Sequence, residues 1–165
     1  GGGSNLSAIS YPYYNEKKVN IFGIESAGKG INSGLHAATI TGKAPIGILL
    51  GARSNVLMDE DGQINESHTE ASGLDFSGTG PEICYMASTG KIKFRATTDK
   101  EAQETFLMMC KKTCILPDIE ACYVINAALK EIKKRNNPRE NHLIHLCGSG
   151  ESNVGRMLKY KRDNE

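Results

Sequence analysis

Short apolar runs alternate with helical stretches along this chain, and that alternation restricts the fold more than any other feature. Three runs have the length and composition of strands: "VNIFGIE" (19–25), "IGILLG" (46–51) and "KIKFRAT" (91–97). The capping box "TDKE" at 98–101 predicts the start of a helix that runs to about Lys112. We therefore expect an α/β fold, a three-layer α/β/α sandwich with a mainly parallel central sheet.

The C-terminal third continues the same pattern. "EACYVINAALKEIKKR" (120–135) predicts a longer helix with a basic end, "HLIHLCG" (142–148) predicts a strand, and a final helix follows a Gly-rich turn. Earlier, "DEDG" at 59–62 separates two extended runs and indicates a hairpin turn. Asp118 and Glu120, two residues apart at a helix start, are expected to point away from each other.

Composition limits the range of partners. The 165 residues suit one domain, and 20 Lys and Arg against 19 Asp and Glu give no global charge that would favour nucleic acid or an anionic membrane. No apolar run approaches the roughly 18 residues that span a bilayer, and no signal peptide is evident. Five cysteines without CxxC spacing indicate reduced, mostly buried thiols. We expect a soluble, cytoplasmic protein.

The opening "GGGSN" has the composition of an anion-binding loop. Consecutive glycines let several N–H groups converge on one anion, and Ser4 and Asn5 add a hydroxyl and an amide before a predicted helix. Ligands of α/β folds bind at the carboxyl ends of strands, which places the loop after "FGIE", the segment around Glu120 and "CGSG" on one rim. A phosphate cradle is one interpretation of "GGGSN", and a remnant of a flexible tag is the other.

Six stretches considered together resemble the β subunit of tryptophan synthase in order and spacing. They are "GGGSN" (1–5), "GIESAGKGINSGLHAA" (23–38), "DEDGQINESH" (59–68), "SGLDFSGTGPE" (72–82), "TDKEAQETF" (98–106) and "ILPDIEACYVINAAL" (115–129). The resemblance covers nearly the whole chain and favours a severed loop over a tag. It implies that residues 1–165 are a C-terminal cofactor-binding lobe that begins inside the phosphate loop, without an N-terminal partner domain and leading strand.

The resemblance implies roles for particular residues. Pyridoxal phosphate is the expected cofactor, and its phosphate would be held by Gly1, Gly2, Gly3, Ser4 and Asn5. Glu120 would stand next to the cofactor ring, and Asp75 would engage the serine substrate. The main-chain carbonyls of Phe76 and Gly78 would hold a monovalent cation, Na⁺ or K⁺.

Cys147 takes the place of a family serine that faces the pyridine nitrogen, because "LCGSGE" stands where the family has "LSGRGD". A thiol is a weak neutral partner, so the ring nitrogen need not be protonated, which favours expulsion of the β-substituent. The alternative is a buried core thiol after a strand. "ASGLD", "FSG", Ser149 and Glu151 also depart from the family pattern and put substrate geometry and domain closure in question.

The implied reaction of the intact protein is L-serine plus indole to L-tryptophan, by β-elimination and addition of indole, in a homodimer with an α subunit as partner. The Schiff-base lysine is expected upstream in a His-Lys motif, and Lys29 is expected to be solvated, so this chain alone would be inactive. Two alternatives stay open. One is another β-replacing or deaminating lyase of the same fold; the other is a non-catalytic fragment or degenerate relative that binds only phosphate or a partner chain.

Overall fold

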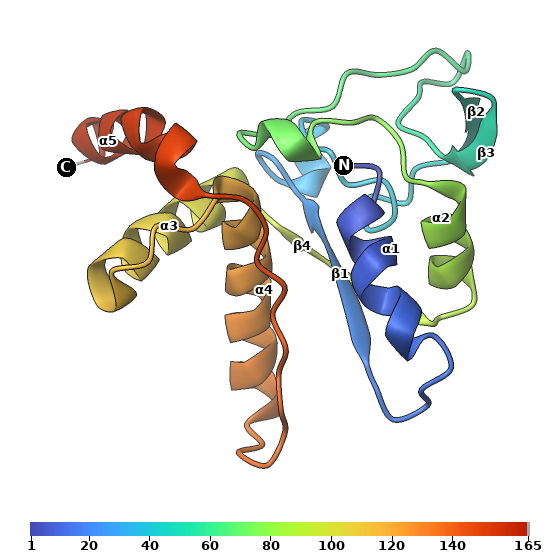
Figure 1. Ribbon diagram of the computed structural model, residues 1–165. Coiled ribbons are helices and arrows are strands. Elements are labelled where there is room, and N and C mark those ends of the chain that lie inside the picture. The colour runs from blue at the N-terminus through green and yellow to red at the C-terminus, as the bar shows by residue number, and fades with distance from the viewer. Residues whose placement is uncertain (165) are drawn as a thin grey trace. The chain divides into compact units, whose positions relative to one another are not determined.

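The computed structural model describes residues 1–164 and divides into two compact units (Figure 1). Unit 1 comprises Gly1–Ala96, and unit 2 begins at Thr97. The strands of the described residues lie in unit 1, apart from Thr97, the final residue of the last strand, and the other regular elements of unit 2 are helices. Among residues 1–164, no helix combines the length and hydrophobicity that a bilayer span needs.

The sheet of unit 1 pairs β1 (Ile21–Ser26) with β4 (Ile92–Thr97), and both strands overlap the predicted apolar runs. The Lys93 ammonium donates a hydrogen bond of 2.9 Å to Oδ1 of Asn20, the residue just before β1. The two strands therefore start side by side and run in the same direction (Figure 1). The predicted α/β class with a parallel sheet is confirmed.

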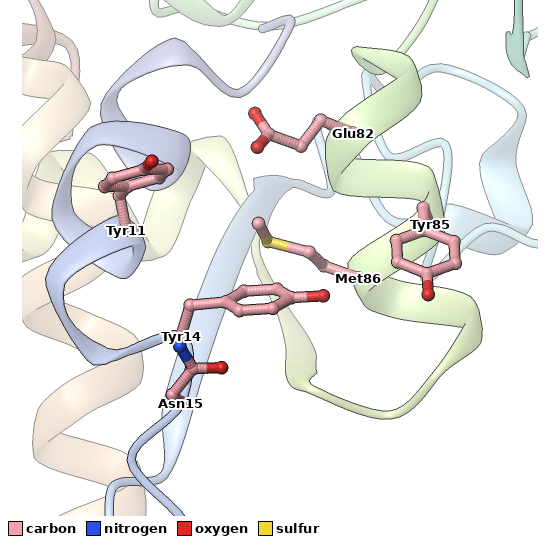
Figure 2. A pocket seen from close by; sticks show the side chains of 6 residues that line it. All are labelled: Tyr11, Tyr14, Asn15, Glu82, Tyr85 and Met86. Atoms are coloured by element: carbon pink, nitrogen blue, oxygen red, sulfur yellow. The ribbon is translucent and has the colours of Figure 1, made fainter.

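The core of unit 1 lies between this sheet and two short helices, α1 (Ser4–Ser10) and α2 (Pro81–Ser88). Ile21, Ile83, Met86 and Ile92 are buried together, and Leu6, Tyr13 and Phe94 pack against them. Met86 reaches from α2 toward the segment that carries Tyr11 and Tyr14 (Figure 2). Burial of these apolar side chains is what holds the helices on the strands.

A second, antiparallel pair in unit 1 is formed by β2 (Ile46–Leu49) and β3 (Ala52–Asn55). Leu50 and Gly51 both have positive φ, as a two-residue hairpin turn requires. Farther on, an isolated antiparallel bridge joins Met58 to Ile64, and the Asp59 N–H donates to the Gln63 carbonyl at 2.9 Å. The hairpin turn predicted at 59–62 is confirmed. Short 3₁₀ turns complete unit 1 at Tyr11–Tyr13, Ile31–Ser33 and Ser72–Leu74.

Unit 2 contains α3 (Asp99–Thr113), α4 (Ile119–Arg135), a 3₁₀ turn at Gly150–Asn153 and α5 (Val154–Asp163). Both bonds of the predicted capping box are present: Thr98 Oγ1 accepts from the Glu101 N–H, and the Glu101 carboxylate accepts from the Thr98 N–H. The buried Tyr123 of α4 donates its hydroxyl to Asp99 of α3 at 2.6 Å. Polar bonds therefore fix how α3 and α4 pack.

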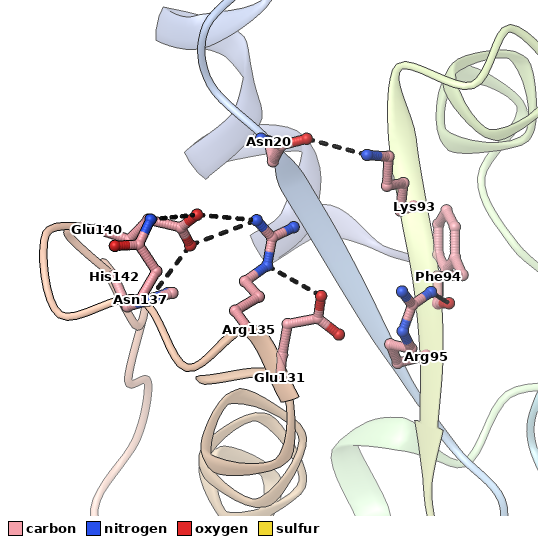
Figure 3. Close-up of polar contacts among 9 residues, drawn as sticks. All are labelled: Asn20, Lys93, Phe94, Arg95, Glu131, Arg135, Asn137, Glu140 and His142. Atoms are coloured by element: carbon pink, nitrogen blue, oxygen red, sulfur yellow. Dashed lines mark hydrogen bonds and ion pairs between the residues drawn. The ribbon is translucent and has the colours of Figure 1, made fainter. Parts of the chain in front are cut away.

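The C-terminal end of α4 is basic, as predicted, and is joined to the following turn by ion pairs (Figure 3). Arg135 contacts Glu131 at 3.0 Å and Glu140 at 3.3 Å. Asn136 ends the helix in the left-handed conformation, where its N–H donates to the Ile132 carbonyl. Cations at this end complement the helix dipole.

The prediction of a strand at 142–148 is wrong. The structure has irregular backbone there, and the side chain of Leu143 is 75% exposed. The alternation "HLIHL" has the period of a strand, but a strand exists only where a neighbouring backbone forms a ladder with it. No such ladder forms along 142–148, so the pattern alone was not sufficient.

Candidate functional site

The glycine loop at the start of unit 1 is held in a conformation that needs glycine. Gly3 has a φ of +95° and precedes the first residue of α1, and a β-carbon there would lie 2.9 Å from Cγ1 of Ile83. A β-carbon at Gly1 would lie 2.6 Å from the Gly73 carbonyl oxygen. The first N–H groups of a helix have no intrahelical acceptor. The loop therefore leads directly into the start of α1, where the N–H groups of Ser4 and Asn5 have no acceptor within the helix.

This loop lies beside the segment that is predicted to face the substrate. The Gly2 carbonyl accepts a hydrogen bond of 2.8 Å from the Gly80 N–H. The Phe76 ring lies 3.8 Å from where a β-carbon of Gly2 would stand. Unit 1 thus brings the predicted phosphate loop and the predicted substrate segment, far apart in sequence, into one neighbourhood.

Asp75 lines a shallow, open hollow of about 470 Å³ in unit 1. The Ser67 hydroxyl donates to Asp75 Oδ1 at 2.6 Å, which fixes one carboxylate oxygen. The lining contains both apolar and polar side chains: Leu49, Ile64, Glu66, Ser67, Asp75, Phe76 and Ser77. A carboxylate held by Ser67 in a hollow that also contains apolar side chains is suited to a small molecule with both polar and apolar parts.

Phe76 and Gly78 flank Ser77, where the backbone bends, and Gly78 forms an isolated antiparallel bridge with Val56. The neighbouring Ser77 carbonyl accepts from the Leu57 N–H at 2.8 Å, and the Thr79 N–H donates to the Asn55 carbonyl at 3.2 Å. These two bonds flank the Val56–Gly78 bridge, so the Gly78 carbonyl is not used by the pairing. Within residues 1–164, no three or more His, Cys, Asp or Glu side chains are grouped to hold a metal ion.

Glu25, near the end of β1, forms a dense set of hydrogen bonds that the sequence analysis missed. Its two carboxylate oxygens accept from three backbone N–H groups at 2.7–2.9 Å and from two hydroxyls, all of them in residues 39–41. The Thr39 hydroxyl also contacts the Thr79 hydroxyl. The sequence signal was the acid at the carboxyl end of a buried strand, followed fourteen residues later by the Thr-rich "TIT". Glu25 thereby ties β1 to the 39–41 turn.

Asp118 and Glu120 meet in unit 2, contrary to the prediction that they point apart. Asp118 is the N-cap of α4, with an extended backbone, and its Oδ1 accepts from the Ile119 N–H at 3.0 Å. Burial raises the pKa of Asp118, and the hydrogen-bonding carboxyl of Glu120 raises it further. Helical spacing does not apply to an N-cap, because its side chain folds back over the first turn, where Glu120 also lies.

The "CGSG" turn packs onto the same helix start. A side chain at Gly148, whose φ is +76°, would overlap the Asp118 carboxyl, and the Gly150 N–H donates to the Leu116 carbonyl at 3.2 Å. Burial raises the pKa of the Cys147 thiol, and the carboxyls of Asp118 and Glu120 raise it further. Two residues predicted to face the cofactor ring, Glu120 and Cys147, are thus brought together in unit 2.

A separate hollow of about 480 Å³ in unit 1 contains none of the predicted site residues. Tyr11, Tyr14, Asn15, Glu82, Tyr85 and Met86 line it (Figure 2). The Ser7 hydroxyl donates to the Glu82 carboxylate at 2.6 Å, and the Lys91 ammonium lies 5.6 Å from the centre of the Tyr14 ring. The Glu82 carboxylate in this hollow is thus already engaged by the Ser7 hydroxyl.

The comparisons with known proteins agree with the motifs. No protein-family model matches the chain. It is 38% identical over 155 residues to a tryptophan synthase beta chain from Leptothrix cholodnii, an alignment that covers 94% of this chain and 36% of that protein. This chain therefore spans about a third of the length of that curated relative. The predicted resemblance to tryptophan synthase β chains is confirmed.

The fold is shared with a solved structure of an L-serine ammonia-lyase from the fungus Rhizomucor miehei. The TM-score is 0.65 and the sequence identity is 13%, with 98% of this chain and 47% of the other chain covered. At this identity the likeness concerns the fold alone.

Proposed function

We propose that this chain is part of a pyridoxal-phosphate enzyme that condenses L-serine with indole to form L-tryptophan. The observation that carries the proposal is the 38% identity to a tryptophan synthase beta chain, which extends over 94% of this chain. The remaining parts of the working enzyme are an upstream domain with the Schiff-base lysine, a second subunit of the homodimer and an α subunit. Residues 1–165 act as its cofactor-binding lobe, and the enzyme works in the cytoplasm.

The cofactor phosphate binds at Gly1, Gly2, Gly3, Ser4 and Asn5. Support comes from Gly3, whose left-handed backbone would be strained by any side chain, and from the helix that begins immediately after it. Backbone N–H groups at such a start favour an anion, and the Ser4 hydroxyl and Asn5 amide add donors. The residues present therefore fit a phosphate.

The groups that face the cofactor ring are Cys147 and Glu120. When bound, pyridoxal phosphate supplies an electron sink for loss of the serine hydroxyl. The raised pKa of Cys147 keeps the thiol protonated near neutral pH, so it is a neutral partner for the ring nitrogen. Glu120, half-buried beside it, keeps the ring side of the site polar.

The substrate side is formed by Asp75 and the carbonyls of Phe76 and Gly78. Asp75 orients L-serine, and its own orientation comes from the 2.6 Å bond that Ser67 donates. The two carbonyls hold Na⁺ or K⁺, which prefer oxygen ligands. Support comes from the Gly78 carbonyl, which the bridge to Val56 leaves unused.

A second candidate function is deamination of serine by a lyase of the same fold. Cys147, Ser149 and Glu151 favour it, because they stand where the tryptophan synthase pattern has Ser, Arg and Asp. The two candidates differ in the step after loss of the hydroxyl: addition of indole in one, release of a keto acid and ammonia in the other.

The test begins with the intact mass of the full-length protein after borohydride reduction in the presence of pyridoxal phosphate. One pyridoxyl adduct on a chain heavier than 17.9 kDa is expected. Assays of the same protein with L-serine should then give tryptophan when indole is present. Pyruvate and ammonia, unaffected by indole, would indicate the deaminating lyase, and a protein with neither adduct nor turnover would contradict both functions.

Variants of Cys147 sharpen the assay. Cys147→Ser, which restores the family hydroxyl, should keep turnover within a few-fold. Cys147→Asp places a carboxylate where the thiol stands, which favours a protonated ring nitrogen. Turnover should fall at least tenfold, because a protonated ring draws more negative charge into itself. Cys114→Ser, at an exposed cysteine, is the matched control and should behave as the unchanged protein.

A further inference from the structure

Asp118 makes more contacts than an N-cap needs. Its Oδ1 accepts from the Ile119 N–H at 3.0 Å and from the Asn153 side-chain amide at 2.5 Å. Its backbone carbonyl accepts from the Cys122 thiol at 3.3 Å. One residue thus connects the start of α4 with the 3₁₀ turn at Gly150–Asn153.

The other carboxylate oxygen of Asp118 faces the "CGSG" turn. Gly148 packs so closely on it that a β-carbon at this position would overlap Oδ2. Two residues later, the Gly150 N–H donates to the Leu116 carbonyl, and a side chain there would overlap the Pro117 carbonyl. The turn that carries Cys147 is therefore seated on the segment 116–118, with the Asp118 carboxyl at its centre.

We propose that Asp118 is the positioning residue of the Cys147 turn: its carboxyl seats the turn on the start of α4 and so sets the place and the reactivity of the Cys147 thiol. The Asn153 amide completes the arrangement by holding the carboxyl from the other side. The seating itself is independent of any cofactor. Its consequence for the cofactor ring rests on the function proposed above.

The electrostatic consequence can be measured. The titratable groups around Asp118 are Glu120 and Cys122 on α4 and Cys147 on the turn, and the neutral Asn153 amide faces it from the 3₁₀ turn. Besides burial, Asp118 and Glu120 are the two carboxyls that raise the pKa of Cys147. Removing the charge of Asp118 while keeping its shape should lower that pKa, because one of the two negative charges that oppose the thiolate is gone.

The experiment is alkylation of the full-length protein with iodoacetamide, as purified and after removal of any bound cofactor. Rates at individual cysteines are followed by peptide mass spectrometry across the alkaline range, because the thiolate is the reactive form. In Asp118→Asn, the midpoint of the Cys147 profile should fall by about half a unit, which makes alkylation below the midpoint about threefold faster. The plateau at high pH should stay unchanged, because Asn can still accept from the Ile119 N–H and the Asn153 amide.

Two further variants separate charge from seating. Asp118→Ala removes the carboxyl that supports Gly148, so the plateau rate at Cys147 should rise several-fold as the turn loosens. Glu151→Gln removes an exposed carboxylate from the same 3₁₀ turn and should leave both midpoint and plateau unchanged. The exposed Cys114 is the internal reference for reagent and pH.

A folded Asp118→Asn protein whose Cys147 midpoint does not move would overturn the proposal, whatever the alanine variant does. Circular dichroism checks that the variant is folded, and Asp118→Asn decides alone if Asp118→Ala fails to fold. The outcome is separable from the proposed function. If the alkylation profiles are as expected but no pyridoxyl adduct forms, the positioning role of Asp118 stands. Only the proposed binding of pyridoxal phosphate is then contradicted.

Discussion

The two units carry candidate site residues of different kinds. In unit 1 the predicted contacts are largely backbone: the glycine loop, the first N–H groups of α1, and the carbonyls of Phe76 and Gly78. In unit 2 they are side chains, with Asp118, Glu120 and Cys147 grouped at a helix start. A backbone site depends on conformation and on the absence of side chains, whereas a side-chain site depends on charge. Mutations of the candidate site residues should therefore act mainly on stability in unit 1 and mainly on titration in unit 2.

The largest effect is expected at Gly3. Gly3→Ala adds a β-carbon both in the left-handed conformation and 2.9 Å from Ile83, so the free energy of unfolding should fall by about 2–4 kcal/mol. Gly34→Ala is the matched control, because Gly34 has a φ of +74° but open space around it. It should cost only about 1 kcal/mol. Equal losses in urea titrations would show that close packing of the loop contributes nothing.

Glu25 is the exception in unit 1, since there a side chain organises the backbone. Glu25→Gln replaces one acceptor oxygen by an amide that would face the N–H and hydroxyl donors of Thr41. The free energy of unfolding should fall by about 2 kcal/mol, because partly buried donors lose a charged acceptor. Glu16→Gln, at an exposed carboxylate, should change it by less than about 0.5 kcal/mol. An unchanged free energy of unfolding in Glu25→Gln would show that residues 39–41 keep their conformation without the Glu25 carboxylate.

A smaller effect is expected at the capping box of α3. Thr98→Ala should lower the free energy of unfolding by about 1 kcal/mol, because the Glu101 N–H loses its acceptor. The comparison is Lys100→Ala, which removes an exposed pair with Glu104 at 4.0 Å and should cost less than about 0.5 kcal/mol. If the two variants unfold at the same urea concentration, the cap is not stabilising this unit.

The smallest effect concerns the pH dependence of stability in unit 2. The pKa of Asp118 is raised by burial and by Glu120, so the folded protein holds that proton more readily than the unfolded chain does. The free energy of unfolding therefore falls as pH rises from the ordinary pKa of an Asp to the raised value. Asp118→Asn lacks this titration, so its stability relative to the unchanged protein should rise across that window and level off above it. Urea titrations from about pH 3.5 to neutral pH check this, and a constant difference would contradict it.

Prediction from sequence succeeded where the signal was local. The Thr98–Glu101 capping box, the turn at 59–62 and the runs that became β1, β2 and β4 depend on neighbours a few residues away. It failed at 142–148, where a strand-like alternation found no backbone to pair with. It also failed for Asp118 and Glu120, since helical spacing says nothing about an N-cap side chain.

By itself the sequence determined the α/β class, the positions of most helices and strands, and the motifs that resemble the tryptophan synthase β subunit. Propensity, capping and turn chemistry act over a few residues, so they can be recognised in the chain. Only the tertiary structure decided that Gly80 meets the glycine loop, that Glu25 holds residues 39–41 and that the Cys147 turn is seated on Asp118. Those contacts join residues far apart in sequence, and packing, which no local pattern encodes, selects them.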